Sequence, residues 1–421
     1  MHGSCLGNER EHSVEERAVQ LLHFTADRNM PDTQAVTASQ RVDCGRQLTD
    51  ARMVADLARQ QASLIDCDDG YPEAELRLLA SSSLSAAPLP TRLGGAGMGT
   101  EPGRTSALLR SLAILGSGNL TVARIYEGHV NALQLIATYG SPEQIRSAVD
   151  DVMHHGRIFG IWNTWNTGTG DGVELVPTRS GYRMRGSKTF ASGAGHIARA
   201  IVTGRLPDGG WQMCLVAMDR VDAEVDRTFW HPLGMRSSAS HRITFHDVPL
   251  DSDELVGKPG DYERDPLFRG GTLRFAAAQV GSAQELFEVS CRYVQSVGRS
   301  GDPYQIERAG LALVALRSGS LWLDEGAVVH DRYLRASAAG HGEVEAAEEL
   351  VLCAAMTRTA VERICLDVLE LVERSVGARG LLQPAPIERM IRDLRLYLRQ
   401  PSADATLAAI GEHAFTRTPP G

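Results

Sequence analysis

The chain has 421 residues, of which 43% are hydrophobic and 23% are charged, and its formal net charge is −9. This length allows two or three domains with a large core. A negatively charged chain has no general attraction for a polyanion, so nucleic acid is not an expected partner.

Residues 1–40 are polar and lack the apolar core of a signal peptide, and we expect a partly disordered extension there. No apolar run approaches the roughly 20 residues that span a bilayer, so no membrane partner is expected. Seven cysteines without a CxxC pair favour a reduced, cytoplasmic protein. His129 and the His154-His155 pair lack ligand spacing, so we expect no metal site.

Residues 41–156 are predicted to form an all-α N-terminal domain. Apolar residues such as Leu48 and Leu112 recur at roughly helical spacing. Ser141-Pro142 has the form of a helix start, with proline just inside the helix.

Residues 157–258 are predicted to form a central β-domain. Short segments such as Ala198–Arg205 and Trp211–Met218 are rich in β-branched and aromatic residues, and turn-forming residues bound them. Strands separated so closely by turns favour a small barrel or sandwich over βαβ units, and we expect a small β-barrel.

Residues 270–416 are predicted to form a C-terminal four-helix bundle. The expected helices are long, amphipathic and almost free of breakers: Leu273–Val297, Gln305–Ala339, Glu343–Val376 and Ile387–Leu398. The fold class is therefore α+β, with the β-domain between two helical regions.

Two segments of the predicted β-domain suit a polar ligand. Trp162-Asn163-Thr164 leads into a Gly/Thr-rich loop ending at Asp171, whose backbone N–H groups and hydroxyls can contact a polar edge. Phe190 and Ser192 lie in a later segment that ends at Gly195. The alternatives are an ordinary turn-rich entry to a strand for the first segment and a plain strand that ends in glycine for the second.

Two further segments lie in the predicted bundle. Arg299 stands in a loop between two helices and can supply a bidentate, permanently charged contact to a phosphate. Gly377-Ala378-Arg379-Gly380 can present backbone N–H groups to a pyrophosphate. The alternatives are an arginine that caps a helix in a surface loop and a glycine helix C-cap.

In this order, and with Leu233-Gly234-Met235-Arg236 between them, these segments resemble the FAD-dependent acyl-CoA dehydrogenase superfamily over about residues 45–415. The resemblance implies bound FAD, an acyl thioester or other small organic substrate, and a homo-oligomer, either a dimer or a tetramer.

The resemblance also implies roles for the candidate residues. Trp162 and Thr164 would lie along the flavin, Phe190 would pack against it, and Ser192 would donate to flavin N5. The residues expected to reach the dinucleotide part of FAD, in part across a subunit boundary, are Arg299, Gly377, Arg379 and Gly380.

The chain departs from this family at the catalytic base. In most members a Glu in a Tyr-Glu-Gly run takes the α-proton of the thioester, and counting from Arg392-Asp393 that position holds Pro401, which has no proton acceptor. A second position that the family uses corresponds to Gly271. We interpret Tyr126-Glu127-Gly128 as a coincidence, because it lies in the N-terminal helical region.

Three hypotheses follow from the missing base, whose usual contribution is about 10²–10⁴-fold. In the leading one, Asp404 replaces the base and the enzyme performs α,β-dehydrogenation of an acyl thioester; Asp404 can instead cap the last helix. The second is a flavin-dependent monooxygenase on the same scaffold. The third is a protein that binds flavin or an acyl ligand without turnover.

Overall fold

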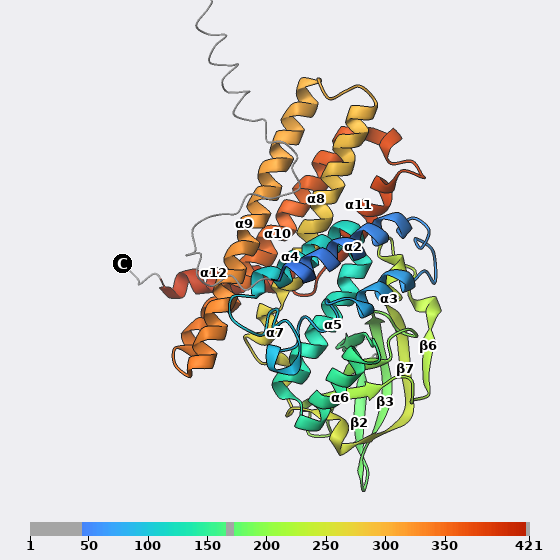
Figure 1. Ribbon diagram of the computed structural model, residues 1–421, viewed down its shortest axis with the longest axis vertical. Coiled ribbons are helices and arrows are strands. Elements are labelled where there is room, and N and C mark those ends of the chain that lie inside the picture. The colour runs from blue at the N-terminus through green and yellow to red at the C-terminus, as the bar shows by residue number, and fades with distance from the viewer. Residues whose placement is uncertain (1–43, 166–171, 418–421) are drawn as a thin grey trace, which may run out of the picture. The chain divides into compact units, whose positions relative to one another are not determined.

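The computed structural model describes residues 44–165 and 172–417, so the predicted extension at residues 1–40 and the loop residue Asp171 lie outside the described residues. The described residues belong to one compact unit, Val42–Gly421 (Figure 1). The division of this unit into three domains stays a prediction.

The N-terminal part is helical, as predicted. Its helices are α2 Gly45–Gln61, α3 Glu73–Ser81, α4 Thr105–Gly118, α5 Leu120–Tyr139 and α6 Pro142–Met153. Ser141 and Gln144 form a reciprocal capping box at the start of α6, with Pro142 at the first position. Asn119 caps α5 by accepting from the Thr121 N–H at 2.9 Å.

The central part is a β-sheet. Its strands are β1 Phe159–Trp162, β2 Val173–Pro177, β3 Gly181–Ala191, β4 Arg199–Arg205, β5 Trp211–Ala217, β6 Ala223–Asp226, β7 His241–Asp251 and β8 Leu255–Val256. The strand order is β6-β7-β3-β2-β4-β5-β8, and β1 pairs in parallel with β4.

This sheet is open, so the predicted closed barrel is wrong. Among the described strands, β6 pairs with β7 and β8 pairs with β5, and no ladder joins these two edges. Both edge strands are short, so neither offers a ladder long enough to close the sheet.

The C-terminal part contains the predicted long helices. They are α7 Leu267–Gly270, α8 Thr272–Ser296, α9 Pro303–Ala339, α10 Glu343–Gly380, α11 Pro386–Tyr397 and α12 Ala403–Arg417. α10 packs along α8 and α9, and α11 packs against α8 (Figure 1). α4 also lies directly on α8, because a Cβ on Gly281 would come within 1.8 Å of the Ala113 carbonyl oxygen.

Helix α5 connects the sheet with the bundle. It packs against β1 on one side and against α8 on the other. A single apolar cluster joins buried residues of all three regions, including Tyr126 on α5, Trp162 on β1 and Leu394 on α11. Side chains of α5 are therefore placed where helices and sheet meet.

Candidate functional site

The end of β3 and the start of β7 bring two of the predicted segments together. The Gly193 N–H donates to the Ser238 carbonyl at 2.9 Å. The Ser192 and Ser240 hydroxyls lie 2.9 Å apart, and the Ser240 and Ser238 hydroxyls lie 2.7 Å apart. A chain of hydroxyls therefore begins at Ser192 and runs into the protein.

Phe190 presents an aromatic surface beside this chain. Its side chain is 56% exposed, and its ring packs edge-on against Phe229 and Trp230. Its φ of 53° is unusual for a residue other than glycine, and such backbone strain is common at functional sites. The exposed ring suits a flat aromatic ligand.

Trp162 and Thr164 hold the exit of β1 against the end of β3. The Thr164 hydroxyl donates to the Thr189 carbonyl at 2.6 Å and accepts from the Thr189 N–H at 3.1 Å. The Trp162 indole N–H donates to the Ser192 carbonyl at 3.1 Å. Both side chains thereby position the backbone around Ser192.

Lys188 is a buried residue that is not among the predicted site residues. Its side chain is 0% exposed, and its ammonium donates to the Thr164 carbonyl at 2.8 Å and to the Thr203 hydroxyl at 3.2 Å. Burial lowers the pKa of Lys188 to about 7. A lysine in a strand is ordinarily read as a solvent-facing residue, so the sequence pattern alone does not reveal its burial.

Glu127 belongs to the run interpreted above as a coincidence, but it lies in the interior between α5 and α8. One carboxylate oxygen accepts from Arg124 at 2.6 Å, and the other accepts from Arg274 at 3.1 Å. Arg274 also donates to the side-chain carbonyl of Gln134 at 3.0 Å. Tyr397, at the end of α11, is close enough to act electrostatically on Arg124.

Arg124 and Ser192 line the same small cavity between α5 and the sheet. The remaining lining residues are glycine or isoleucine: Ile125, Gly128, Gly160, Ile161 and Ile197. Arg124 is surrounded by protein, yet 25% of its side-chain surface stays open. Burial disfavours its charged form, but the Glu127 carboxylate outweighs that effect, and the pKa of Arg124 is raised.

The predicted bundle residues gather elsewhere, at the end of α8. Arg299 is exposed in the α8–α9 loop and pairs with Asp302 at 3.1 Å. Gly377 interrupts α10 with a φ of 61°, Arg379 is exposed, and Gly380 is buried close to Tyr293.

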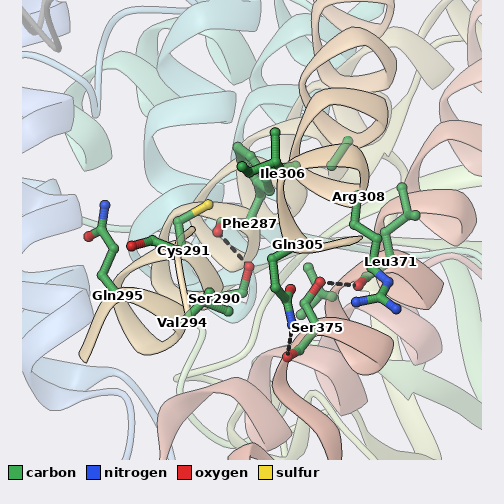
Figure 2. A pocket seen from close by; sticks show the side chains of 14 residues that line it. Phe287, Ser290, Cys291, Val294, Gln295, Gln305, Ile306, Arg308, Leu371 and Ser375 are labelled. Carbon is green, nitrogen blue, oxygen red and sulfur yellow. Dashed lines mark hydrogen bonds between the residues drawn. The ribbon is translucent and has the colours of Figure 1, made fainter. Parts of the chain in front are cut away.

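A cavity of about 240 Å³ lies at this end, between α8, α9 and α10. Figure 2 shows Gln305 on α9 donating to the Ser375 carbonyl on α10 beside it, at 3.1 Å. Much of the lining is apolar, including Phe287, Val294 and Leu371.

The two groups of predicted residues do not meet within one chain. Arg274 lies in the first turn of α8, next to the Glu127 cluster, whereas Arg299 lies beyond the last turn. The 25 residues of α8 separate these positions by roughly 35 Å.

Asp404 lies in the first turn of α12, which begins at Ala403, and its side chain is exposed. The Thr406 N–H donates to the Ser402 carbonyl in this turn. Asp404 is therefore one residue inside the helix rather than at its cap, and its catalytic role stays a prediction.

No family model matches the chain. It is 23% identical over 401 residues to a dibenzothiophene monooxygenase of Rhodococcus erythropolis, which covers 87% of this chain and 92% of the relative. It is 25% identical over 385 residues to the probable FMNH2-dependent monooxygenase SfnC of Pseudomonas putida, covering 87% of this chain and 93% of the relative.

Three solved structures share the fold. The complex of TdsC from Paenibacillus sp. A11-2 with FMN and indole has a TM-score of 0.79 at 21% identity and covers 89% of this chain and 98% of its own. Methanesulfinate monooxygenase MsuC from Pseudomonas fluorescens has a TM-score of 0.77 at 21% identity, with the same coverage. A glutaryl-coenzyme A dehydrogenase complex has a TM-score of 0.74 at 18% identity and covers 90% of this chain and 97% of its own.

The expectation of FAD is wrong, because SfnC is named for FMNH2 and the TdsC structures contain FMN. FMN ends at its phosphate, so a pyrophosphate contact from Gly377, Arg379 and Gly380 has no counterpart in it. These similarities favour the monooxygenase hypothesis over dehydrogenation of a CH–CH bond. No helix among the described residues is long and apolar enough to cross a membrane. The chain has the acyl-CoA dehydrogenase fold, and its relatives from Rhodococcus erythropolis and Pseudomonas putida are monooxygenases.

Proposed function

We propose that this protein is a flavin-dependent monooxygenase that uses reduced FMN and dioxygen to oxygenate a small organic substrate. The observation that carries the proposal is the pairing of a flavin-type site around Ser192 with Pro401 and Gly271 at the positions of the missing base. Oxygen transfer from a flavin requires no carboxylate to take an α-proton, so this reaction can proceed without the missing base.

The residues around Ser192 fit a flavin ring. Phe190 supplies an exposed aromatic surface, and the Ser192 hydroxyl is available as a donor when it accepts its hydrogen bond from Ser240, which in turn pairs with Ser238. Trp162 and Thr164 fix the backbone on either side. When bound and reduced, FMN would supply the electrons that activate dioxygen, with one oxygen atom going to the substrate and the other to water.

We also propose a homo-oligomer, a dimer or a tetramer, in which Arg299 holds the FMN phosphate of a neighbouring copy. The separation along α8 keeps Arg299 away from the Ser192 site of its own chain. Helix α9, which follows Arg299, carries apolar side chains that are at least 40% exposed and recur at helical spacing: Tyr304, Leu311, Val314, Leu321 and Val328. An apolar face of this kind is typical of an interface between protein chains.

A reconstitution experiment tests the proposed function. The full-length protein is incubated with FMN, a flavin reductase, labelled dioxygen and a panel of indole, dibenzothiophene and methanesulfinate, and products are analysed by mass spectrometry. We expect one labelled oxygen atom in a product, and Ser192→Ala should lower its yield. Reduction of bound flavin by an acyl thioester without oxygen would instead establish the dehydrogenase, and neither reaction with bound FMN would favour the non-catalytic hypothesis.

Sedimentation tests the oligomer. Wild-type protein should sediment as a dimer or tetramer, and Val314→Glu should shift it towards monomer and weaken FMN binding together. A monomer with full FMN occupancy would contradict the shared site.

A further inference from the structure

We propose that Lys188 is a positioning residue of the flavin site, and that its buried ammonium makes the site bind reduced FMN more tightly than oxidised FMN. At neutral pH the ring of reduced FMN carries one more negative charge than the ring of oxidised FMN, so a positive charge near the ring discriminates between the two forms. This selectivity serves the proposed function, on which the inference rests, because the monooxygenase uses FMN that arrives reduced.

The first observation is where the hydrogen bonds of Lys188 lead. The ammonium donates to the Thr164 carbonyl at 2.8 Å and to the Thr203 hydroxyl at 3.2 Å. The Thr203 hydroxyl donates in turn to the side-chain carbonyl of Asn163 at 2.8 Å. Both hydrogen bonds of the ammonium therefore end on residues 162–164, the segment that is expected to lie along the flavin.

The same segment is joined to the end of β3, the strand that carries Lys188. The Trp162 indole N–H donates to the Ser192 carbonyl, and the Thr164 hydroxyl bonds to both backbone groups of Thr189. The ammonium therefore adjoins the two backbone segments that frame the proposed ring site. Its side chain is 0% exposed, so water does not screen its charge directly.

The second observation is that no carboxylate pairs with Lys188 among the described residues. The Trp211 ring centroid lies 4.7 Å from its Nζ, and its partner across the ladder on β7 is the apolar Ile243. The Cys214 thiol on β5 acts on it electrostatically, but burial raises the pKa of this thiol, which therefore stays neutral. A negative charge on a ligand would meet an ammonium that no acidic side chain has neutralised.

The charge of Lys188 is also able to respond to such a ligand. Burial lowers the pKa of Lys188 to about 7, and a bound anion nearby would raise it again. The preference for reduced FMN should therefore be fully present below about pH 7 and be lost as pH rises through the raised pKa of the complex. On the neighbouring strands, Glu174 of β2 and Arg205 of β4 pair with each other at 2.7 Å.

Anaerobic titration of the full-length protein with oxidised FMN and with photoreduced FMN tests the proposal without turnover. We expect reduced FMN to bind about 10-fold more tightly at pH 7, the affinity equivalent of a pKa shift of about one unit. A tenfold preference places the midpoint potential of bound FMN about 30 mV above that of free FMN, because the couple transfers two electrons. Equal affinities for the two forms overturn the proposal.

A variant locates the effect at Lys188. Lys188→Met removes the charge and keeps an unbranched side chain, so it should weaken binding of reduced FMN by about 10-fold and change the affinity for oxidised FMN little. The control is Lys258→Met, which removes an exposed ammonium and should change neither affinity. Equal weakening of both forms in Lys188→Met would mean that Lys188 holds the segment in place without selecting the reduced form. That result, or two unchanged affinities, overturns the proposal.

A pH series on the wild-type protein provides a measurement that needs no variant. The ratio of the two affinities should fall from about pH 7 to about pH 9, and in Lys188→Met it should stay constant. A constant wild-type ratio overturns the proposal. Labelled-oxygen product from a protein without this preference would leave the monooxygenase established, whereas no binding of either form of FMN would overturn both.

Discussion

The two ends of helix α8 carry different kinds of site. At its start, Arg274 joins Glu127 and Arg124 in a buried cluster next to Ser192, and every partner comes from the same chain. At its end, Arg299 is exposed and pairs with Asp302 in its own loop. The residues of the first site are enclosed between α5, α8 and the sheet, whereas Arg299 at the second is exposed.

The residues that we expect to contact one flavin lie far apart in the folded chain. The candidate residues around Ser192 and those around Arg299 follow each other in the expected order along the sequence. In the folded chain the length of α8 separates them. In the proposed oligomer, a second copy would bring its Arg299 to the flavin of the first copy.

The largest expected effect comes from breaking the buried cluster. Glu127→Gln should lower the free energy of unfolding by about 3–5 kcal/mol, because the buried Arg274 and the partly buried Arg124 lose their shared carboxylate. Urea unfolding monitored by circular dichroism measures the change. The matched control is Glu143→Gln on the surface of α6, where the loss should not exceed about 1 kcal/mol. Similar values for both variants would mean that the cluster contributes no more than a surface pair.

A substitution of Arg299, at the other end of α8, should change FMN affinity rather than the free energy of unfolding. Arg299→Gln is expected to weaken FMN binding by about 1.5–3 kcal/mol, the usual contribution of hydrogen bonds to a charged group, with little effect on unfolding. Fluorescence titration with FMN measures the affinity. Arg374→Gln, an exposed arginine of α10 paired with Glu370, is the control. Unchanged FMN affinity in Arg299→Gln would remove the phosphate role of this residue.

Lys188, on the sheet side of the Ser192 site, should make the free energy of unfolding depend on pH. Burial lowers the pKa of Lys188 from 10.5 to about 7, so between these values the unfolded chain binds more protons than the folded one. Stability should therefore rise with pH across this window by up to about 1.4 kcal/mol per pH unit, and the cost of burying the charge is fully present below about pH 7. Lys188→Met should flatten that slope, whereas Lys258→Met at an exposed position should keep it. Parallel pH profiles for wild type and Lys188→Met would contradict the assignment.

The smallest effect is expected at Asp404. If the protein is a monooxygenase, Asp404→Asn should leave oxygen incorporation unchanged. The reason is that oxygen transfer needs no α-proton acceptor, so the exposed carboxylate of Asp404 on α12 has no role in it. Mass spectrometry of the labelled product provides the measurement. A loss of thioester-driven flavin reduction in this variant would revive Asp404 as the base of a dehydrogenase.

Much of the secondary structure could be predicted from local pattern. The helical periodicity of Leu273–Val297 corresponds to α8, and the Ser141-Pro142 signal corresponds to the capped start of α6. Such signals depend on residues that are neighbours along the chain, so the sequence contains them directly. The open sheet was not predictable in this way, because turns bound the strands of a barrel and of an open sheet alike. Whether the edge strands β6 and β8 pair with each other decides between them, and they do not.

The sequence by itself determined the order of the elements, the hydroxyl and aromatic residues at the end of β3, and the absence of a carboxylate at Pro401 and Gly271. Only the tertiary structure decided that Glu127 lies in the interior, since its partner Arg274 is 147 residues away along the chain. The physical reason is that a carboxylate is stable there only when its charge is compensated, and the compensating groups on α5 and α8 come together through packing of the two helices.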